Sequence, residues 1–113
     1  MDDCIFCKII KGEIPSTKVY EDDRVVSFHD ISPLAPVHVL TIPKKHIASV
    51  LEIGEEDKEL IGHLHLVLQK VAKQMGVDES GFRVVTNVGV HGQQTVQHLH
   101  YHLLGGRQLQ WEA

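Results

Sequence analysis

A run of alternating histidine and apolar residues near the C-terminus constrains the fold more than any other feature. It reads His98-Leu99-His100-Tyr101-His102-Leu103-Leu104. Alternate side chains of a strand point to opposite faces, so a strand here would place three imidazoles on one face and the apolar side chains in a core behind them. Imidazole is both the usual proton shuttle near neutral pH and a common metal ligand. This strand is therefore the predicted centre of the chemistry.

Length and charge limit the classes of protein that fit. A chain of 113 residues with 42% hydrophobic content suits one domain, residues 1–113, with a single core. The formal net charge of −4 argues against non-specific binding to nucleic acid or to an anionic membrane. No apolar run reaches membrane-spanning length, and the first residues are acidic rather than a basic, apolar leader. We therefore expect a cytoplasmic protein with no nucleic-acid or membrane partner.

Hydrophobic periodicity predicts an α+β fold. A short helix is expected over residues 6–11, and a long one from the acidic residues 55–57 to a C-terminal cap at Gly76. Five strands are predicted over residues 19–21, 24–29, 37–42, 82–87 and 98–104. The strands do not alternate regularly with long helices, which favours an antiparallel sheet with the helices on one side.

The segment before the histidines is a glycine-containing loop, residues 89–95, with the sequence GVHGQQT. Glycines let backbone N–H groups approach an anion, and the side chains of Gln94 and Thr95 add further donors. An ordinary flexible connection is the alternative. The proximity of the loop to the histidines favours phosphate binding.

Cys4 and Cys7 form the second group of candidate functional residues. They are too few and too close together to be a disulfide framework. A structural zinc site needs four ligands, so the pair alone is also compatible with two buried thiols on either side of Phe6. The spacing leaves both possibilities open.

Several segments together resemble one known family, the histidine triad (HIT) superfamily, and within it the HINT-like branch of nucleotide-binding proteins. The segments are IFCKIIKGEIP, FHDISPLAP, VHVLTIPKKHI, HLHYHLL and LLGGRQLQW. The resemblance implies a five-stranded antiparallel sheet with one long and one short helix. It also implies a homodimer with a continuous ten-stranded sheet, in which the tail 105–113 lies at the dimer interface.

The resemblance also implies an activity, hydrolysis of the P–N bond of purine nucleoside 5'-phosphoramidates through a covalent nucleotidyl-histidine intermediate. In that mechanism His100 is the nucleophile, with a carbonyl or other acceptor on its far ring nitrogen. His102 binds the phosphate and assists the leaving group, and His38 orients the nucleophile or contacts the phosphate indirectly. Thr95 stands where many relatives have serine. His98, the first histidine of the triad, completes the expected catalytic set.

Nucleotide-binding residues follow from the same resemblance, which implies purine nucleoside monophosphates and phosphoramidates as ligands. Asp30 is expected to accept hydrogen bonds from the ribose hydroxyls. Asn87 and Gln94 are expected on the phosphate side, together with Thr95, His100 and His102. The slot for the base is expected to be bordered by Phe28, His29 and Ile31.

A subset of the family binds zinc, and the matching ligands here are Cys4, Cys7, His46 and His98. Such a metal would be structural, and no catalytic metal is expected because no carboxylate sits at the spacing of the triad. Dinucleoside polyphosphate hydrolysis, nucleotidyl transfer and a nucleotide-binding scaffold with incidental turnover are the alternative functions.

Overall fold

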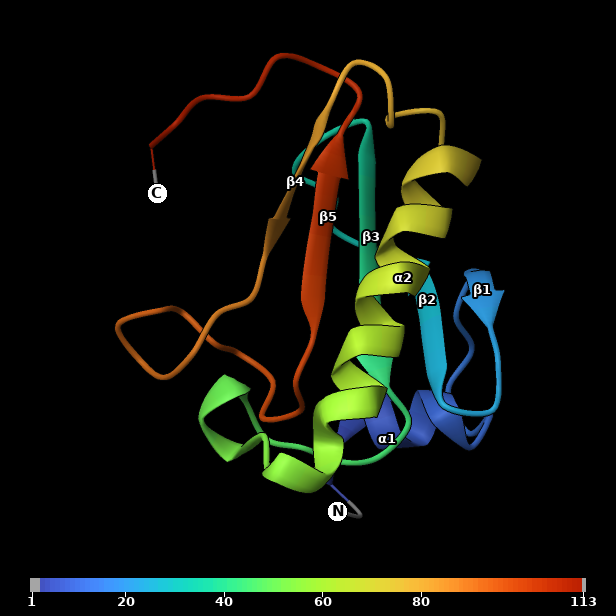
Figure 1. Ribbon diagram of the computed structural model, residues 1–113, viewed down its shortest axis with the longest axis vertical. Coiled ribbons are helices and arrows are strands. Elements are labelled where there is room, and N and C mark those ends of the chain that lie inside the picture. Colours follow the sequence, from blue (N-terminus) through green and yellow to red (C-terminus); the bar gives the residue numbers. More distant parts are fainter. Residues whose placement is uncertain (1–2, 113) are drawn as a thin grey trace.

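Five antiparallel strands form one sheet, in the order β1-β2-β3-β5-β4 (Figure 1). This is a computed structural model, and it describes residues 3–112. The strands are β1 (Lys18–Glu21), β2 (Val25–His29), β3 (Val37–Pro43), β4 (Phe82–Val85) and β5 (Tyr101–Gly105). The helices are α1 (Ile5–Ile10), two single turns (Val50–Glu52 and Glu55–Asp57) and α2 (Lys58–Gln74). The predicted α+β class and the five-stranded antiparallel sheet are confirmed.

Helix α2 covers one face of the sheet with the apolar stripe that its periodicity predicts. Its buried residues pack against apolar side chains of β2, β3 and β5. Burying each leucine or valine side chain contributes about 1.5–3 kcal/mol. The helix ends at Gln74, Met75 is its C-cap residue, and Gly76 follows with φ of 73°, the left-handed conformation expected just after a helix C-terminus. No helix within residues 3–112 is long and apolar enough to cross a membrane.

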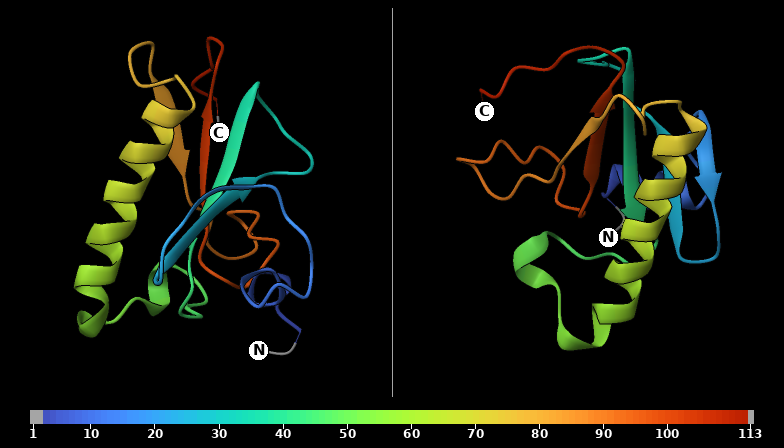
Figure 2. Two further views of the ribbon diagram at one scale, coloured as in Figure 1. Left: turned by 90° about the vertical axis from the view of Figure 1, so that its right-hand side faces the viewer. Right: turned by 45° about the horizontal axis from the view of Figure 1, so that its top comes forward.

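Helix α1 lies on the opposite face, so the prediction of helices on one side was wrong. Figure 2 shows α1 and α2 on either side of the strands. Phe6 and Ile9 of α1 join a second apolar cluster with Leu40 and Ile42, whereas Val39 of the same strand packs on the α2 side. The strand alternation therefore divides the core in two. A six-residue helix is too short for its sequence pattern to indicate which face it covers.

Strand β5 begins at Tyr101, three residues later than predicted. The β3–β5 register pairs Thr41 with Tyr101, and the same register would bring Leu99 opposite Pro43. Proline has no N–H for the ladder, and the amide of Leu99 instead donates to the carbonyl of Ile47 at 2.6 Å. His98 and His100 therefore precede the strand, while Tyr101 and Leu103 enter the core as expected.

Candidate active site

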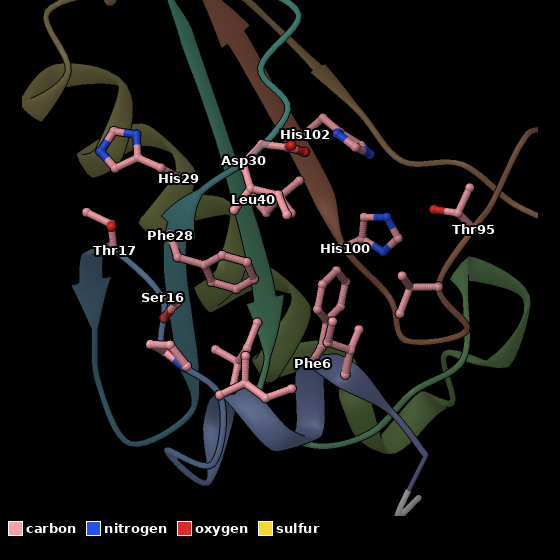
Figure 3. A pocket seen from close by; sticks show the side chains of 16 residues that line it. Phe6, Ser16, Thr17, Phe28, His29, Asp30, Leu40, Thr95, His100 and His102 are labelled. Atoms are coloured by element: carbon pink, nitrogen blue, oxygen red, sulfur yellow. The ribbon is translucent and has the colours of Figure 1, made fainter.

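A cavity of about 670 Å³ opens on the α1 face of the sheet, between α1, β2, β3 and the segment that leads into β5 (Figure 3). This volume lies in the range of small-molecule sites. Seven of the residues predicted from the sequence line it, namely Phe28, His29, Asp30, Ile31, Thr95, His100 and His102. The fold thus brings two distant segments of the predicted site, residues 28–31 and 95–102, to one cavity.

Phe6 is a lining residue that the sequence analysis missed. Its ring centroid lies 5.0 Å from that of His100 and 5.7 Å from that of Phe28, both edge to face. A signal for it existed. Phe6 lies between the two cysteines in the sequence. If those cysteines share a metal ion with His98, Phe6 must lie close to the histidine triad. The other unpredicted lining residues are Ile5, Ile9, Ile14, Pro15, Ser16, Thr17, Leu40 and Val96.

The ring of His100 is held in one tautomer by the backbone. Its Nδ1–H donates to the carbonyl of His98 at 2.7 Å, the kind of acceptor that the family resemblance implies. The tautomer of a neutral imidazole is set by the hydrogen bond that one of its nitrogens makes. The remaining nitrogen, Nε2, therefore carries a lone pair, and His100 lines the cavity.

His102 is held in the opposite tautomer through His38. The amide of Leu34 donates to Nδ1 of His38 at 3.0 Å, so the proton of neutral His38 is on Nε2. That Nε2–H faces Nδ1 of His102 at 2.9 Å, which leaves the proton of His102 on its own Nε2. Burial lowers the pKa of His38, and burial with its histidine neighbours lowers the pKa of His102 to about 4. Both rings are neutral near pH 7.

The same hydrogen bonds argue against a cation between Asp30, His38 and His102. Their ligating atoms are close enough to one another to hold a metal. A metal on Nε2 of His38 would require its proton on Nδ1, where it would face the amide hydrogen of Leu34. The hydrogen-bonding pattern therefore favours a relay of hydrogen bonds over metal ligation here.

Asn87 and Gln94 are not brought into the cavity. The carboxamide of Gln94 is buried and serves the backbone instead. Its Nε2 donates to the carbonyls of Ala48 at 2.7 Å and Val96 at 2.9 Å, and its oxygen accepts from the amide of Gly89 at 3.2 Å. Gln94 thus shapes the loop that carries Thr95, a role that depends on contacts the local sequence does not show.

Cys4, Cys7, His46 and His98 form a compact cluster, with all four ligating atoms within 4.8 Å of one another. Nδ1 of His98 lies 3.3 Å from Sγ of Cys4 and 3.6 Å from Sγ of Cys7, and Nδ1 of His46 lies 3.3 Å from Sγ of Cys7. Tetrahedral zinc, with Zn–S of about 2.3 Å and Zn–N of about 2.0–2.1 Å, holds sulfur and nitrogen about 3.5 Å apart.

The orientation of His98 also fits a zinc ligand. Its Nε2–H donates to the carbonyl of Pro43 at 2.8 Å, which leaves the lone pair on Nδ1, facing the thiols. The donor set and its spacing are thus consistent with a structural zinc that has four protein ligands. The His98 ring belongs to this cluster, while the His98 carbonyl accepts the hydrogen bond that orients the His100 ring.

Comparisons with known proteins agree with this geometry. The family model described as scavenger mRNA decapping enzyme C-term binding matches residues 3–111. A HIT-like protein of Synechococcus elongatus is 54% identical over 97% of this chain and 96% of its own length. A 14 kDa zinc-binding protein of Brassica juncea is 50% identical over 96% of this chain and 97% of its own. The solved structure of a HIT family hydrolase from Clostridium thermocellum has a TM-score of 0.96 at 53% identity, covering 99% of this chain and 97% of that one.

Proposed function

Because this chain belongs to the histidine triad superfamily, we propose that it is a hydrolase that cleaves the P–N bond of purine nucleoside 5'-phosphoramidates through a covalent nucleotidyl-histidine. Solved relatives that carry the name HIT family hydrolase support the reaction class. The observation that carries the proposal is the hydrogen bond from Nδ1 of His100 to the His98 carbonyl, because it leaves a lone pair on Nε2 of a cavity-lining histidine.

The proposed reaction has two displacements at phosphorus. Nε2 of His100 attacks, the N–P bond to the imidazole forms, and the P–N bond of the substrate breaks. The leaving amine gains a proton from water, relayed by the hydroxyl of Thr95. Water then attacks phosphorus, the bond to His100 breaks, and the proton of that water returns to solvent. Splitting one displacement into two lowers each barrier.

Polar groups that are already oriented would serve the substrate. The Nε2–H of His102 donates to a phosphoryl oxygen and stabilises the charge that develops there. Asp30 would accept from the ribose hydroxyls. Its Oδ1 already accepts from the amide of Ser32 at 2.7 Å, which holds the carboxylate in place. The base would lie against Phe28 and cover Ile31, whose side chain is 98% exposed in the free protein.

Zinc bound by the cysteine and histidine cluster would fasten α1 to the segment before β5. The metal would stabilise the fold by cross-linking these two segments, and we propose that it takes no part in the reaction at phosphorus. Neither cysteine is in a disulfide, which suits the reducing cytoplasm that we propose as the location. Because Phe6 lies between those cysteines, the cross-link would also hold the aromatic wall of the nucleoside slot beside His100.

The test of the proposed function is mass spectrometry of a rapidly quenched reaction with an adenosine phosphoramidate. We expect an adenylyl adduct on His100 that forms and decays within the turnover time. Turnover with no adduct on any histidine would contradict the covalent route. A stable complex without turnover would indicate a nucleotide-binding scaffold instead.

We also propose a homodimer joined through the β4 edge. β4 is the last strand of the sheet, and Phe82 and Val84 are exposed along it. Leu66 on α2 is 58% exposed and Trp111 in the tail is 93% exposed, so a partner would cover apolar surface on both elements.

Two measurements check the dimer. Light scattering at micromolar concentration should give twice the chain mass of 12.7 kDa. Removing residues 108–113 should change the relative kcat/KM for different leaving groups more than the melting temperature, because the tail would reach the partner's active site. Ala113 lies outside the described residues. A mass near that of one chain would contradict the dimer, and an unchanged substrate preference would contradict the role of the tail.

A further inference from the structure

Arg107 joins the C-terminal segment to the loop that precedes β3. Its Nη2 donates to the carbonyl of Leu34 at 2.9 Å, and its Nη1 donates to the carbonyl of Gln108 at 3.1 Å. The side chain is exposed, and it lines neither the nucleotide cavity nor the zinc cluster. Arg107 thus contacts Leu34, the loop residue whose amide donates to the ring of His38.

Leu34 is therefore held from both sides of its backbone. Its amide donates to Nδ1 of His38, while its carbonyl accepts from Arg107. The loop around it is mostly exposed: Leu34 itself is 71% exposed, and of residues 31–36 only Ala35 is buried. Where little of a loop is buried, individual hydrogen bonds hold its conformation. The hydrogen bond from Arg107 is one of few in this loop.

A close backbone approach beside Arg107 supports the same connection. Gly106 has φ of 91°, and a Cβ there would lie 2.9 Å from Cβ of Pro36. Only glycine allows the chain to pass this close to the loop in that conformation. The C-terminal segment thus meets the loop at two successive residues, Gly106 and Arg107.

We propose that Arg107 is a positioning residue that sets the tautomer of His102. By holding Leu34, it keeps Nδ1 of His38 an acceptor, keeps the His38 proton on Nε2, and so keeps the His102 proton on Nε2. The hydrogen bond at one ring nitrogen decides which nitrogen carries the proton. Loss of the Leu34 amide would leave only the Asp30 carboxylate, 3.5 Å from Nε2 of His38, to favour the present tautomer, and both rings would populate the other one as well. The use of that proton on a phosphoryl oxygen rests on the proposed function, whereas the hydrogen-bond chain stands on the geometry.

Arg107→Ala tests the proposal, with Arg107→Lys as the conservative variant. Arg24→Ala is the matched control, because Arg24 is also exposed and its side chain makes no hydrogen bond among the described residues. The hydrogen-exchange rate of the Leu34 amide and the ring-nitrogen chemical shifts of His38 and His102 measure the state of these hydrogen bonds directly. Steady-state kinetics with an adenosine phosphoramidate measure whether the His102 tautomer matters for turnover.

In Arg107→Ala we expect faster exchange at Leu34 and ring shifts that move towards a mixture of tautomers. We expect kcat to fall about three- to tenfold, the effect of losing one hydrogen bond, with KM changed less than about twofold. Arg107→Lys should recover part of kcat, and Arg24→Ala should match wild type in every measurement.

Wild-type Leu34 exchange and wild-type ring shifts in Arg107→Ala would overturn the proposal, as would equal changes in Arg24→Ala. The two proposals fail separately. If wild-type protein does not hydrolyse phosphoramidates, the exchange and shift measurements still decide the role of Arg107. If Arg107 has no effect on them, an adenylyl adduct on His100 still supports the hydrolase.

Discussion

Replacing His100 with alanine or glycine is expected to abolish phosphoramidate turnover while nucleotide binding persists. The substitution removes the only atom that the proposed mechanism joins covalently to phosphorus, so kcat should fall more than about a thousandfold. Asp30 and His102 keep their own hydrogen bonds, so the Kd for adenosine monophosphate, measured by calorimetry, should change by less than about fivefold.

The matched control is His91→Ala, because His91 is exposed in the loop 89–95 and does not line the cavity. It should retain wild-type kcat. Activity in His100→Ala above a few per cent of wild type would place the nucleophile elsewhere or rule out the covalent route. Loss of binding together with turnover would show that the substitution disturbs the slot beside Phe6.

Removing the metal ligands is expected to have the second large effect, this time on stability. Wild-type protein purified without added metal should hold about one zinc per chain, and the double variant Cys4→Ser, Cys7→Ser should hold none. Its melting temperature should be lower by roughly 10 °C or more, since even about 2 kcal/mol shifts the Tm of a domain of this size by roughly that amount. Elemental analysis and thermal unfolding check both expectations.

The alternative for the cysteines is simple packing of two thiols. Chelation of wild-type protein separates the two explanations, because a strong chelator lowers the melting temperature only if a bound metal contributes to it. A fresh preparation without zinc, or a melting temperature that the chelator does not change, would favour packing. In the double variant KM should also rise, because α1 would no longer hold Phe6 firmly against His100.

The sequence predicted the sheet and the long helix correctly because both are local patterns. Alternation places Tyr101 and Leu103 in the core, and helical spacing buries Leu64 and Val67. The sequence predicted the last strand from residue 98, whereas β5 begins at Tyr101. Whether the ladder continues beyond Tyr101 depends on its partner in β3, where Pro43 has no N–H to offer.

The sequence by itself determined which side chains could do chemistry and, through the resemblance, which family they belong to. Only the tertiary structure decided where each imidazole is used. His98 faces the thiols, His100 presents Nε2 to the cavity, and His102 takes its tautomer from Leu34 through His38. The physical reason is that ring direction and tautomer are set by hydrogen bonds to backbone groups that are distant in sequence, which the spacing of the triad does not contain.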